Sequence, residues 1–339
     1  MAERSNAAVL KTVSPQGLGG SNPSLSANIS AHIAPNWIRQ PVISVTKLGK
    51  HLGAEISGVD LSRPPDDDTF ARLSDAFFEN QVVVFRDQKL TPSQQSAFTR
   101  RFGELEHHVR KEHCLDGHPE ILVVSNVLDG RGRSIGVQDA GRFWHSDLSY
   151  KQMPSLLSAL YALEVPVKDG VVLGATDFAS VAAAYDALPE DLKRRLQGLR
   201  NVHSYRYYRT RNRLAQSEER ARGGRDVQEH VPSEIQLKSV PDVEVPIVRT
   251  HPVTGRKSLF INEAHTSRVV GLPEDEGAAL LAQLCAHIVS PEFRFEHHWR
   301  AGDLLMWDNV AVQHKAKFDY ELPLRRLMHR TTVRGSAPV

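Results

Sequence analysis

One short stretch, residues 143–150, constrains this chain more than any other, because it holds the only His-X-Asp sequence among sixteen histidines. Aromatic residues alternate there with small or polar ones, which predicts a β-strand. Side chains two residues apart on a strand share a face, so His145 and Asp147 are expected to reach one point. They would be two of the three ligands of the 2-His-1-carboxylate site that holds non-haem Fe(II). A histidine beside a surface carboxylate gives the same short string, so this motif alone does not distinguish a metal site from an unrelated surface pair.

A site of this type needs a second histidine, and the best candidate is His314. It ends a run, residues 304–314, that predicts a strand and a turn. The polar pair Asp308-Asn309 lies in this run and can orient metal ligands through hydrogen bonds. A surface histidine after a strand has the same appearance in sequence, so His314 can be either a metal ligand or a surface residue.

Two arginines follow on a predicted strand, residues 325–333. Arg326 and Arg330 share a face of that strand and lie about 13 Å apart along it, at about 3.3 Å per residue. Guanidinium groups facing a β core are costly unless each meets an anion, so an inward orientation predicts two anionic groups in one cavity. The opposite orientation, with both arginines in solvent and Leu327 and Val333 packed inward, stays open.

Composition narrows the class of protein. With 339 residues, 40% apolar and 24% charged, the chain can build a sizeable core in one or two domains. Two cysteines far apart, Cys114 and Cys285, indicate neither a disulfide framework nor a thiolate zinc site, and favour a reducing compartment. No apolar run approaches the roughly 18 residues of a membrane span, and no secretory signal pattern opens the chain. The net charge of +2 points to no polyanionic partner.

The order of the predicted elements favours a β-rich fold. Residues 1–41 are rich in Ser, Ala, Asn, Gly and Pro, which predicts a disordered tail before a single domain over 42–339. Helices are expected from Asp66, from Thr91-Pro92 and from Pro273, and two more on either side of Pro189. Strands are expected at 43–45, 54–56, 81–85, 121–125, 157–163, 245–248, 258–262, 293–299, 304–307 and 325–333. Because strands and helices do not alternate regularly, a double-sheet β core decorated by helices is favoured over a parallel sheet.

Residues 193–225 are crowded with arginine and contain Tyr205, Tyr207 and Tyr208. Basic residues interleaved with aromatic ones can mark a nucleic-acid-binding surface. Glu218, Glu219 and other acidic residues dilute the charge, so a solvated loop or an active-site lid is the favoured interpretation.

Four motifs in order resemble the TauD/TfdA family of Fe(II)- and 2-oxoglutarate-dependent dioxygenases, which includes taurine dioxygenase and 2,4-dichlorophenoxyacetate dioxygenase. The resemblance runs from about Val42 to Val333. The motifs are Trp144-His145-Ser146-Asp147, Gly174-Ala175-Thr176-Asp177-Phe178, Arg249-Thr250-His251-Pro252-Val253-Thr254-Gly255-Arg256-Lys257, and Trp307-Asp308-Asn309 with His314 and Arg325-Arg326-Leu327-Met328-His329-Arg330.

The resemblance implies a role for each matching residue. His145, Asp147 and His314 would be the catalytic iron ligands. Thr176 and Arg326 match the positions that bind the C5 carboxylate of 2-oxoglutarate, and Arg330 matches the one that clamps the acidic group of the substrate.

Three further positions bear on the substrate. His108 falls near a substrate-binding histidine of taurine dioxygenase. His265 stands where that enzyme has a phenylalanine over its substrate, and Gly141 near a substrate-contacting asparagine. These two departures put taurine itself in doubt.

The fold implied by the resemblance is a double-stranded β-helix, the jelly roll of cupin-like proteins, with helical insertions. The implied reaction, of the EC 1.14.11 type, is hydroxylation of a C–H bond in a small acidic substrate (a carboxylate, sulfonate or sulfate ester) with Fe(II), 2-oxoglutarate and O₂. Succinate and CO₂ are the coproducts, and a group on the hydroxylated carbon can be released.

Two alternatives remain: a zinc-dependent hydrolase on the same His/Asp/His site, and a non-catalytic β-sandwich binding module. The zinc alternative gives no reason for the paired arginines. We expect a cytoplasmic enzyme with a small-molecule substrate, no nucleic-acid or membrane partner, and a homodimer or homotetramer as possible assemblies.

Overall fold

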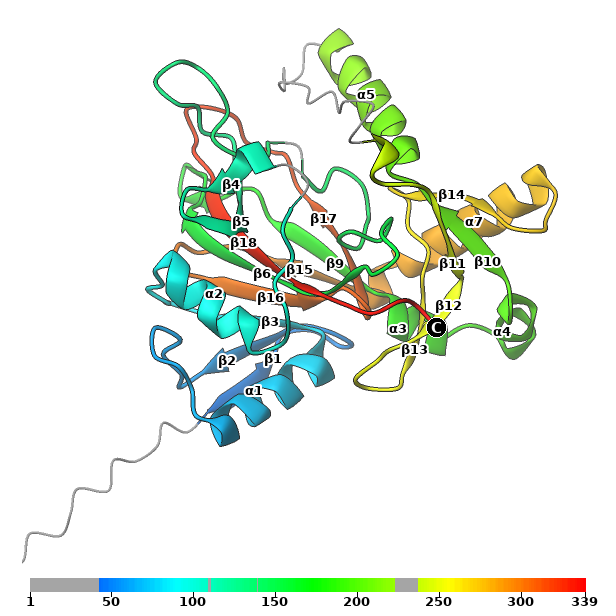
Figure 1. Ribbon diagram of the computed structural model, residues 1–339, viewed down its shortest axis with the longest axis horizontal. Helices are drawn as coiled ribbons and strands as arrows, with labels where there is room; N and C mark the ends of the chain where they lie inside the picture. Colours follow the sequence, from blue (N-terminus) through cyan, green and yellow to red (C-terminus); the bar gives the residue numbers. More distant parts are fainter. Residues whose placement is uncertain (1–42, 109–110, 139, 223–236) are drawn as a thin grey trace, which may run out of the picture. The chain divides into compact units, whose positions relative to one another are not determined.

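An eight-stranded sheet, built from the most apolar runs of the chain, organises the structure. A computed structural model describes residues 43–108, 111–138, 140–222 and 237–339, and all of them belong to one compact unit, Pro41–Val339. In spatial order the strands are β1 (Ser44–Lys47), β2 (Ala54–Ser57), β3 (Val82–Phe85), β16 (Leu304–Asp308), β6 (Ser155–Glu164), β18 (Leu327–Arg334), β5 (His118–Ser125) and β4 (Cys114–Leu115). Neighbouring strands are antiparallel except β2 and β3 (Figure 1).

A second sheet, β15 (Arg294–His297), β9 (Thr176–Ser180) and β17 (Val312–Ala316), packs on one face of the first. Val84, Leu160 and Trp307 of the large sheet enter one buried cluster with Phe178 and Val312 of the small sheet. Strands that are apolar on both faces, such as Val82–Phe85, are expected where a sheet is covered on both sides. The two sheets therefore form the predicted β core.

Two helices cover the other face of the large sheet. In α1 (Asp67–Asn80), Asp66 caps the first turn by accepting from the Thr69 backbone N–H, as predicted. The next helix, α2 (Pro92–Arg100), begins with a capping box between Thr91 and Gln94. Apolar side chains of both helices join one cluster with strand residues such as Val83 and Met306. Because successive strand residues alternate between faces, Val83 and Val84 pack into different cores.

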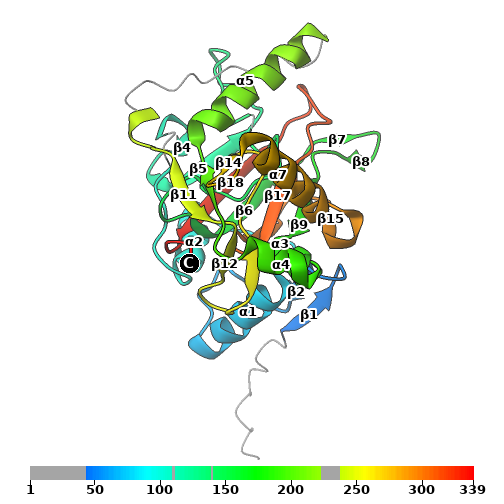
Figure 2. The ribbon, with the colours of Figure 1, turned by 90° about the vertical axis from the view of Figure 1, so that its right-hand side faces the viewer.

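A third cluster lies around the remaining helices and short strands. It combines buried apolar residues of α3 (Val181–Asp186), α4 (Glu190–Leu196) and α7 (Glu274–Ile288) with β12 (Val248–Thr250), β13 (Lys257–Leu259) and β14 (Thr266–Val269). Figure 2 shows α7, in brown, beside α3 and α4. β10 (Arg200–His203) pairs with β14 and with β11 (Val243–Pro246), and β7 (Val167–Lys168) pairs with β8 (Val171–Val172). Two short 3-10 helices complete the described elements, Lys111–His113 and Pro291–Phe293.

Two sequence expectations are wrong. Residues 143–150 are not a strand: only His145 forms a bridge, and Leu148 has a φ of 53°, which turns the chain. Residues 205–221 are not a loop but the helix α5 (Tyr205–Ala221), capped by Ser204. One face of this helix is buried, and its residues recur at helical spacing: Tyr205, Arg209, Asn212 and Gln216. Most of them are polar, so the sequence showed no apolar periodicity.

Two other expectations concern the ends and the environment of the chain. The tail predicted at 1–41 lies outside the described residues, so it and the single domain stay predictions. None of the described helices combines the length and the apolar character that crossing a membrane requires.

We expect Phe178→Ala to lower the free energy of unfolding by about 3–5 kcal/mol, because this fully buried ring fills the space between the two sheets. Urea unfolding measures the change. Leu214→Ala, at an exposed site on α5, is the matched control and should shift stability by no more than about 0.5 kcal/mol. Equal stability of the two variants would contradict packing of the sheets through Phe178.

Candidate active site

Two histidines far apart in the chain are brought together by backbone pairing. His145 N donates to His314 O at 3.1 Å, and His314 N donates to His145 O at 2.9 Å. This antiparallel bridge attaches the loop after residue 141 to the edge of the small sheet, at β17. The two imidazole rings lie with their centroids 4.1 Å apart. The predicted pair of histidines therefore meets, although through a single bridge and not through two strands.

Asp147 joins the histidines from a turn. Its backbone N–H donates to Asn309 Oδ1 at 3.0 Å, and Leu148 follows with a positive φ. The carboxylate Oδ1 lies 3.8 Å from His145 Nε2. One ligand atom from each of His145, Asp147 and His314 can be chosen so that all lie within 4.8 Å of one another. The three side chains thus converge as the sequence indicated.

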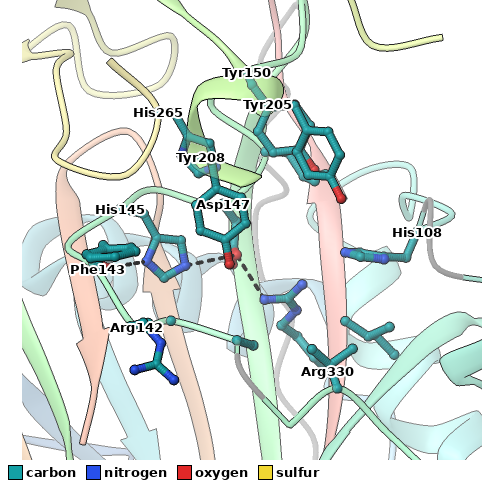
Figure 3. A pocket seen from close by; sticks show the side chains of 15 residues that line it. His108, Arg142, Phe143, His145, Asp147, Tyr150, Tyr205, Tyr208, His265 and Arg330 are labelled. Carbon is teal, nitrogen blue, oxygen red and sulfur yellow. Dashed lines mark hydrogen bonds and ion pairs between the residues drawn. The ribbon is translucent and has the colours of Figure 1, made fainter. Parts of the chain in front are cut away.

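A set of hydrogen bonds fixes the Asp147 carboxylate. Ser158 Oγ donates to Oδ2 at 2.7 Å. Arg330 Nη1 donates to Oδ1 at 2.9 Å, as Figure 3 shows. Asn309 Nδ2 in turn donates to Ser158 Oγ at 3.0 Å. Asn309 therefore holds both the backbone and, through Ser158, the carboxylate of Asp147, which is the orienting role predicted for the Asp308-Asn309 pair.

Asp308, the other residue of the pair, does not contact Asp147 and instead binds His251 and the turn before β17. Asp308 Oδ2 accepts from His251 Nε2 at 2.8 Å, and both side chains are buried. Asp308 Oδ1 accepts the backbone N–H groups of Val310 and Ala311, which shapes the turn that leads into β17 and His314.

The protonation states of the three residues suit a divalent metal. Burial lowers the pKa of His145, and burial together with the neighbouring His145 keeps the pKa of His314 well below its ordinary value, so both rings are neutral. Burial opposes the ionisation of Asp147, but the Arg330 guanidinium and the hydrogen bond from Ser158 outweigh it and hold the pKa of this carboxyl well below its ordinary value, so it is ionised. Neutral imidazoles and an ionised carboxylate are the forms that bind metal ions.

The ring nitrogens also fit a metal. His145 Nδ1 faces two carbonyl oxygens, Phe143 O at 2.9 Å and His314 O at 3.0 Å. Nδ1 therefore carries the hydrogen, and Nε2 offers its lone pair toward Asp147. His314 Nδ1 is buried without a hydrogen-bond partner among the described residues. Two histidines held in this way, beside one carboxylate, are a donor set for a metal ion with open positions.

The inner cavity, lined by Thr176, Trp299, His314, Arg326 and Arg330 among others, lies on one side of the three residues. Thr176 Oγ1 accepts from Trp299 Nε1 at 3.1 Å, and the Arg326 guanidinium lies over the Trp299 ring at 5.8 Å. Both arginines are buried, so the inward of the two orientations left open by the sequence is the one adopted. Arg326 Nε has no hydrogen-bond partner in the described part of the chain, as expected of a cation placed to receive an anion.

A second cavity is lined by Tyr150, Tyr205, Tyr208 and His265 among others, and is called the tyrosine cavity here. It shares His145 and Arg330 with the inner cavity. Figure 3 shows Tyr150, Tyr205 and Tyr208 with His265 on one wall and His108 facing them. The structure therefore brings both predicted substrate histidines, His108 and His265, to one cavity. Tyr205 and Tyr208 come from the first turn of α5, in the segment for which the sequence left a solvated loop and an active-site lid open.

Gly141 lies between the two cavities. Its φ is +88°, and a Cβ there would come within 3.3 Å of Ala316 Cβ and 3.5 Å of His145 Cε1. The departure from asparagine noted at this position therefore leaves room for a close approach of the loop to His145.

The contribution of several residues to the site could not be predicted from the sequence. Ser158 and Trp299 lie on or beside apolar strands, and nothing local marks their role. The rings of Tyr150 and Tyr205 lie with their centroids 4.9 Å apart, tilted by 40°, although the two residues are far apart in sequence. Some of the arginines on or near α5 pair with acidic groups, as in Arg195–Glu276, Arg200–Glu244 and Arg211–Glu263.

We expect Ser158→Ala to weaken Fe(II) binding by about 10–100-fold, because the carboxylate of Asp147 loses its orienting donor. Anaerobic titration with Fe(II) measures the dissociation constant. Ser155→Ala is the matched control, since Ser155 is buried on the same strand and its Oγ has no hydrogen-bond partner among the residues described. If both variants bind iron as the wild type does, Ser158 does not position Asp147.

Comparison with known proteins identifies the family. The model of the family described as "Taurine catabolism dioxygenase TauD, TfdA family" matches residues 44–332. The alpha-ketoglutarate-dependent 2,4-dichlorophenoxyacetate dioxygenase of Cupriavidus pinatubonensis (strain JMP 134 / LMG 1197) is 38% identical over 295 residues, 84% of this chain and 96% of that protein.

Solved structures agree. A taurine dioxygenase from Burkholderia xenovorans superposes with a TM-score of 0.69 at 32% identity, covering 88% of this chain and 93% of its own. AAD-2 in complex with Mn(II) and N-oxalylglycine gives a TM-score of 0.69 at 31% identity, covering 87% and 98%. The chain belongs to the TauD/TfdA family of 2-oxoglutarate-dependent dioxygenases, enzymes that use Fe(II), 2-oxoglutarate and O₂.

Proposed function

We propose that this dioxygenase hydroxylates a C–H bond of a small acidic substrate, a carboxylate, sulfonate or sulfate ester, and forms succinate and CO₂. The observation that carries the proposal is the convergence of His145, Asp147 and His314 between two cavities, each with a buried arginine on its wall. Where the hydroxylated carbon bears an ether or ester oxygen or a sulfonate, the product would release that group. Family membership decides against the zinc-hydrolase and binding-module alternatives.

His145, Asp147 and His314 would hold the iron. Bound Fe(II) supplies the activation of O₂ and the oxidation of the substrate C–H bond. The chain contributes geometry: Ser158, Asn309 and the carbonyl oxygens around His145 Nδ1 fix the ligand atoms before metal arrives.

Thr176 and Arg326 would bind the distal carboxylate of 2-oxoglutarate in the inner cavity. Arg326 Nε has no hydrogen-bond partner among the residues that the structure describes. Thr176 Oγ1 accepts from Trp299 Nε1, so the threonine O–H can donate to a carboxylate. The complex of AAD-2 with N-oxalylglycine supports the binding of 2-oxoglutarate by this chain, since that compound differs from 2-oxoglutarate by an N–H in place of a methylene group.

Arg330 would have two tasks. Its Nη1 holds Asp147, while its Nε lacks a partner among the described residues and is buried beside the tyrosine cavity. We assign the remaining donors to the acidic group of the substrate, with His108 and His265 on the same cavity wall. The relatives are named for 2,4-dichlorophenoxyacetate and for taurine, a carboxylate and a sulfonate, which supports an acidic head group in this chain and leaves its identity open.

Three broader expectations accompany the proposal. The two packed sheets support a double-stranded β-helix with helical insertions. The cytoplasmic location and the homo-oligomeric state stay predictions.

The test of the function is the anaerobic visible spectrum of the protein with Fe(II) before and after 2-oxoglutarate is added. We expect a weak charge-transfer band in the green with the wild type and none with His145→Ala. Succinate release with small acids would then reveal the substrate. A wild-type protein that binds iron and 2-oxoglutarate without any such band, or fails to bind iron, would contradict the assignment.

We expect Arg326→Leu to raise the KM for 2-oxoglutarate by about 10–100-fold, because a buried charge-assisted contact to the distal carboxylate is lost. Steady-state succinate formation measures KM and kcat. Arg325→Leu, next to it on the chain, is the control: Arg325 is exposed and pairs with Glu164 at 2.7 Å. A similar KM in both variants would show that Arg326 does not bind the cosubstrate.

A further inference from the structure

Arg326, the buried arginine of the inner cavity, lies just outside a regular strand. β18 begins one residue later at Leu327, which pairs with Ser125, the last residue of the neighbouring strand β5 (Figure 1). On its other side, β18 shifts register against β6 between Leu327 and Met328. The backbone ladder of the large sheet is therefore irregular next to the residue whose side chain lines the inner cavity.

The chain that leads to Arg326 gives it little support. Residues 321–323 and Arg325 are exposed, and a turn closes at Leu324, whose backbone N–H donates to Glu321 O at 2.9 Å. Segments with few buried side chains are the ones that open most easily. The direction of the Arg326 side chain therefore depends on the groups that hold its backbone from the neighbouring strand.

Two residues at the end of β5 hold the backbone of Arg326. Ser125 Oγ donates to Arg326 O at 2.8 Å, and Asn126 N donates to the same carbonyl oxygen at 3.3 Å. Asn126 Oδ1 accepts from Arg326 N–H at 2.8 Å. The Asn126 side chain thus takes the place of a backbone acceptor at the point where the regular ladder ends.

The amide group of Asn126 is fixed in one orientation. Its Oδ1 faces the N–H of Arg326, which can only donate, and its Nδ2 lies 2.8 Å from the carbonyl oxygen of Leu324, which can only accept. Both contacts require the same assignment of oxygen and nitrogen. One side chain therefore bridges residues 324 and 326 and sets the angle at which the chain enters β18.

The far end of Arg326 has little room to compensate for a shift of its backbone. A Cβ on Gly174 would stand 3.5 Å from Arg326 Cδ, and the guanidinium lies over the Trp299 ring at 5.8 Å. The side chain between these contacts is buried. A backbone shift would therefore displace the guanidinium, and a misplacement of about 1 Å can cost a functional group about 100-fold in effect.

We propose that Asn126, assisted by Ser125, is a positioning residue for 2-oxoglutarate: it directs Arg326 to the distal carboxylate. The inference rests on the proposed role of Arg326 and goes beyond it, because neither Asn126 nor Ser125 lines the inner cavity. The expected signature is selective. Loss of Asn126 weakens recognition of the distal carboxylate and leaves binding of the 2-oxo acid end unchanged.

The test compares two ligands that differ only at the distal end: 2-oxoglutarate and 2-oxopentanoate, in which a methyl group replaces the distal carboxylate. Anaerobic titration of the Fe(II) protein, followed by the charge-transfer band, gives a dissociation constant for each ligand. The ratio of the two constants is the carboxylate preference, in which general losses of folding or of iron cancel. We expect a preference of about 10–100-fold in the wild type and little in Arg326→Leu.

Asn126→Ala should lower the carboxylate preference by at least about fivefold, because the Arg326 N–H and the Leu324 carbonyl lose their partner together. Ser125→Ala, which removes one donor to Arg326 O, should lower the preference by about threefold. This second variant keeps the test available where Asn126→Ala does not fold.

Asp129→Ala is the matched control, because Asp129 lies in the loop that follows Asn126. Its carboxylate accepts the backbone N–H groups of Arg131 and Arg133 at 2.8 and 2.9 Å and does not contact Arg326. We expect a carboxylate preference within about twofold of the wild type.

A preference that Asn126→Ala and Ser125→Ala leave intact while Arg326→Leu abolishes it would overturn the positioning role. An equal loss in Asp129→Ala would overturn it too, since the effect would then belong to the loop as a whole. Equal binding of the two acids by the wild type would instead contradict the proposed function of Arg326.

Discussion

Two backbone hydrogen bonds between His145 and His314 are the contact on which the site depends. They join segments 169 residues apart and set the two rings side by side. Strand β17, which carries His314, is itself held by β9 in the small sheet, and that sheet packs through Phe178 on the large one. The three candidate ligands are therefore positioned by the packed sheets, although His145 and Asp147 lie in a loop and a turn. A metal site built in this way does not need a strand under each ligand.

The buried charges of Asp147 and Arg330 stabilise each other. Asp147 is held ionised in the interior because Arg330 and Ser158 donate to it, and Arg330 is tolerated in the interior because Asp147 receives it. A buried pair of this kind adds little to stability but defines geometry strongly, since removal of one partner leaves the other uncompensated. Arg326 has no such partner among the described side chains, which is the asymmetry expected if a carboxylate from outside the chain completes it.

The wall of the tyrosine cavity is assembled from elements that differ in kind from the core. Tyr150 follows the turn after Asp147, Tyr205 and Tyr208 begin α5, and His265 precedes β14. None of these four residues belongs to the two packed sheets, so their side chains take no part in the packing that positions His314. This separation gives a physical reason why one family accommodates substrates as different as those for which its members are named.

The sequence by itself predicted the three candidate ligands and determined the reaction class and the β-rich fold, because each rests on short patterns or on motifs in order: His145-X-Asp147, the distal His314, and Arg326 close to Arg330. Capping residues such as Asp66 and Thr91 also placed two helices. Only the tertiary structure decided that both arginines face inward, that a turn at Leu148 and not a strand aims Asp147, and that Ser158 and Asn309 orient it. The reason is that local patterns predict elements and periodicity, whereas the partners of a buried polar group are chosen by tertiary packing. Asn309 and Arg330 contact Asp147 from 162 and 183 residues away, and even Ser158, 11 residues away, reaches it from a different element.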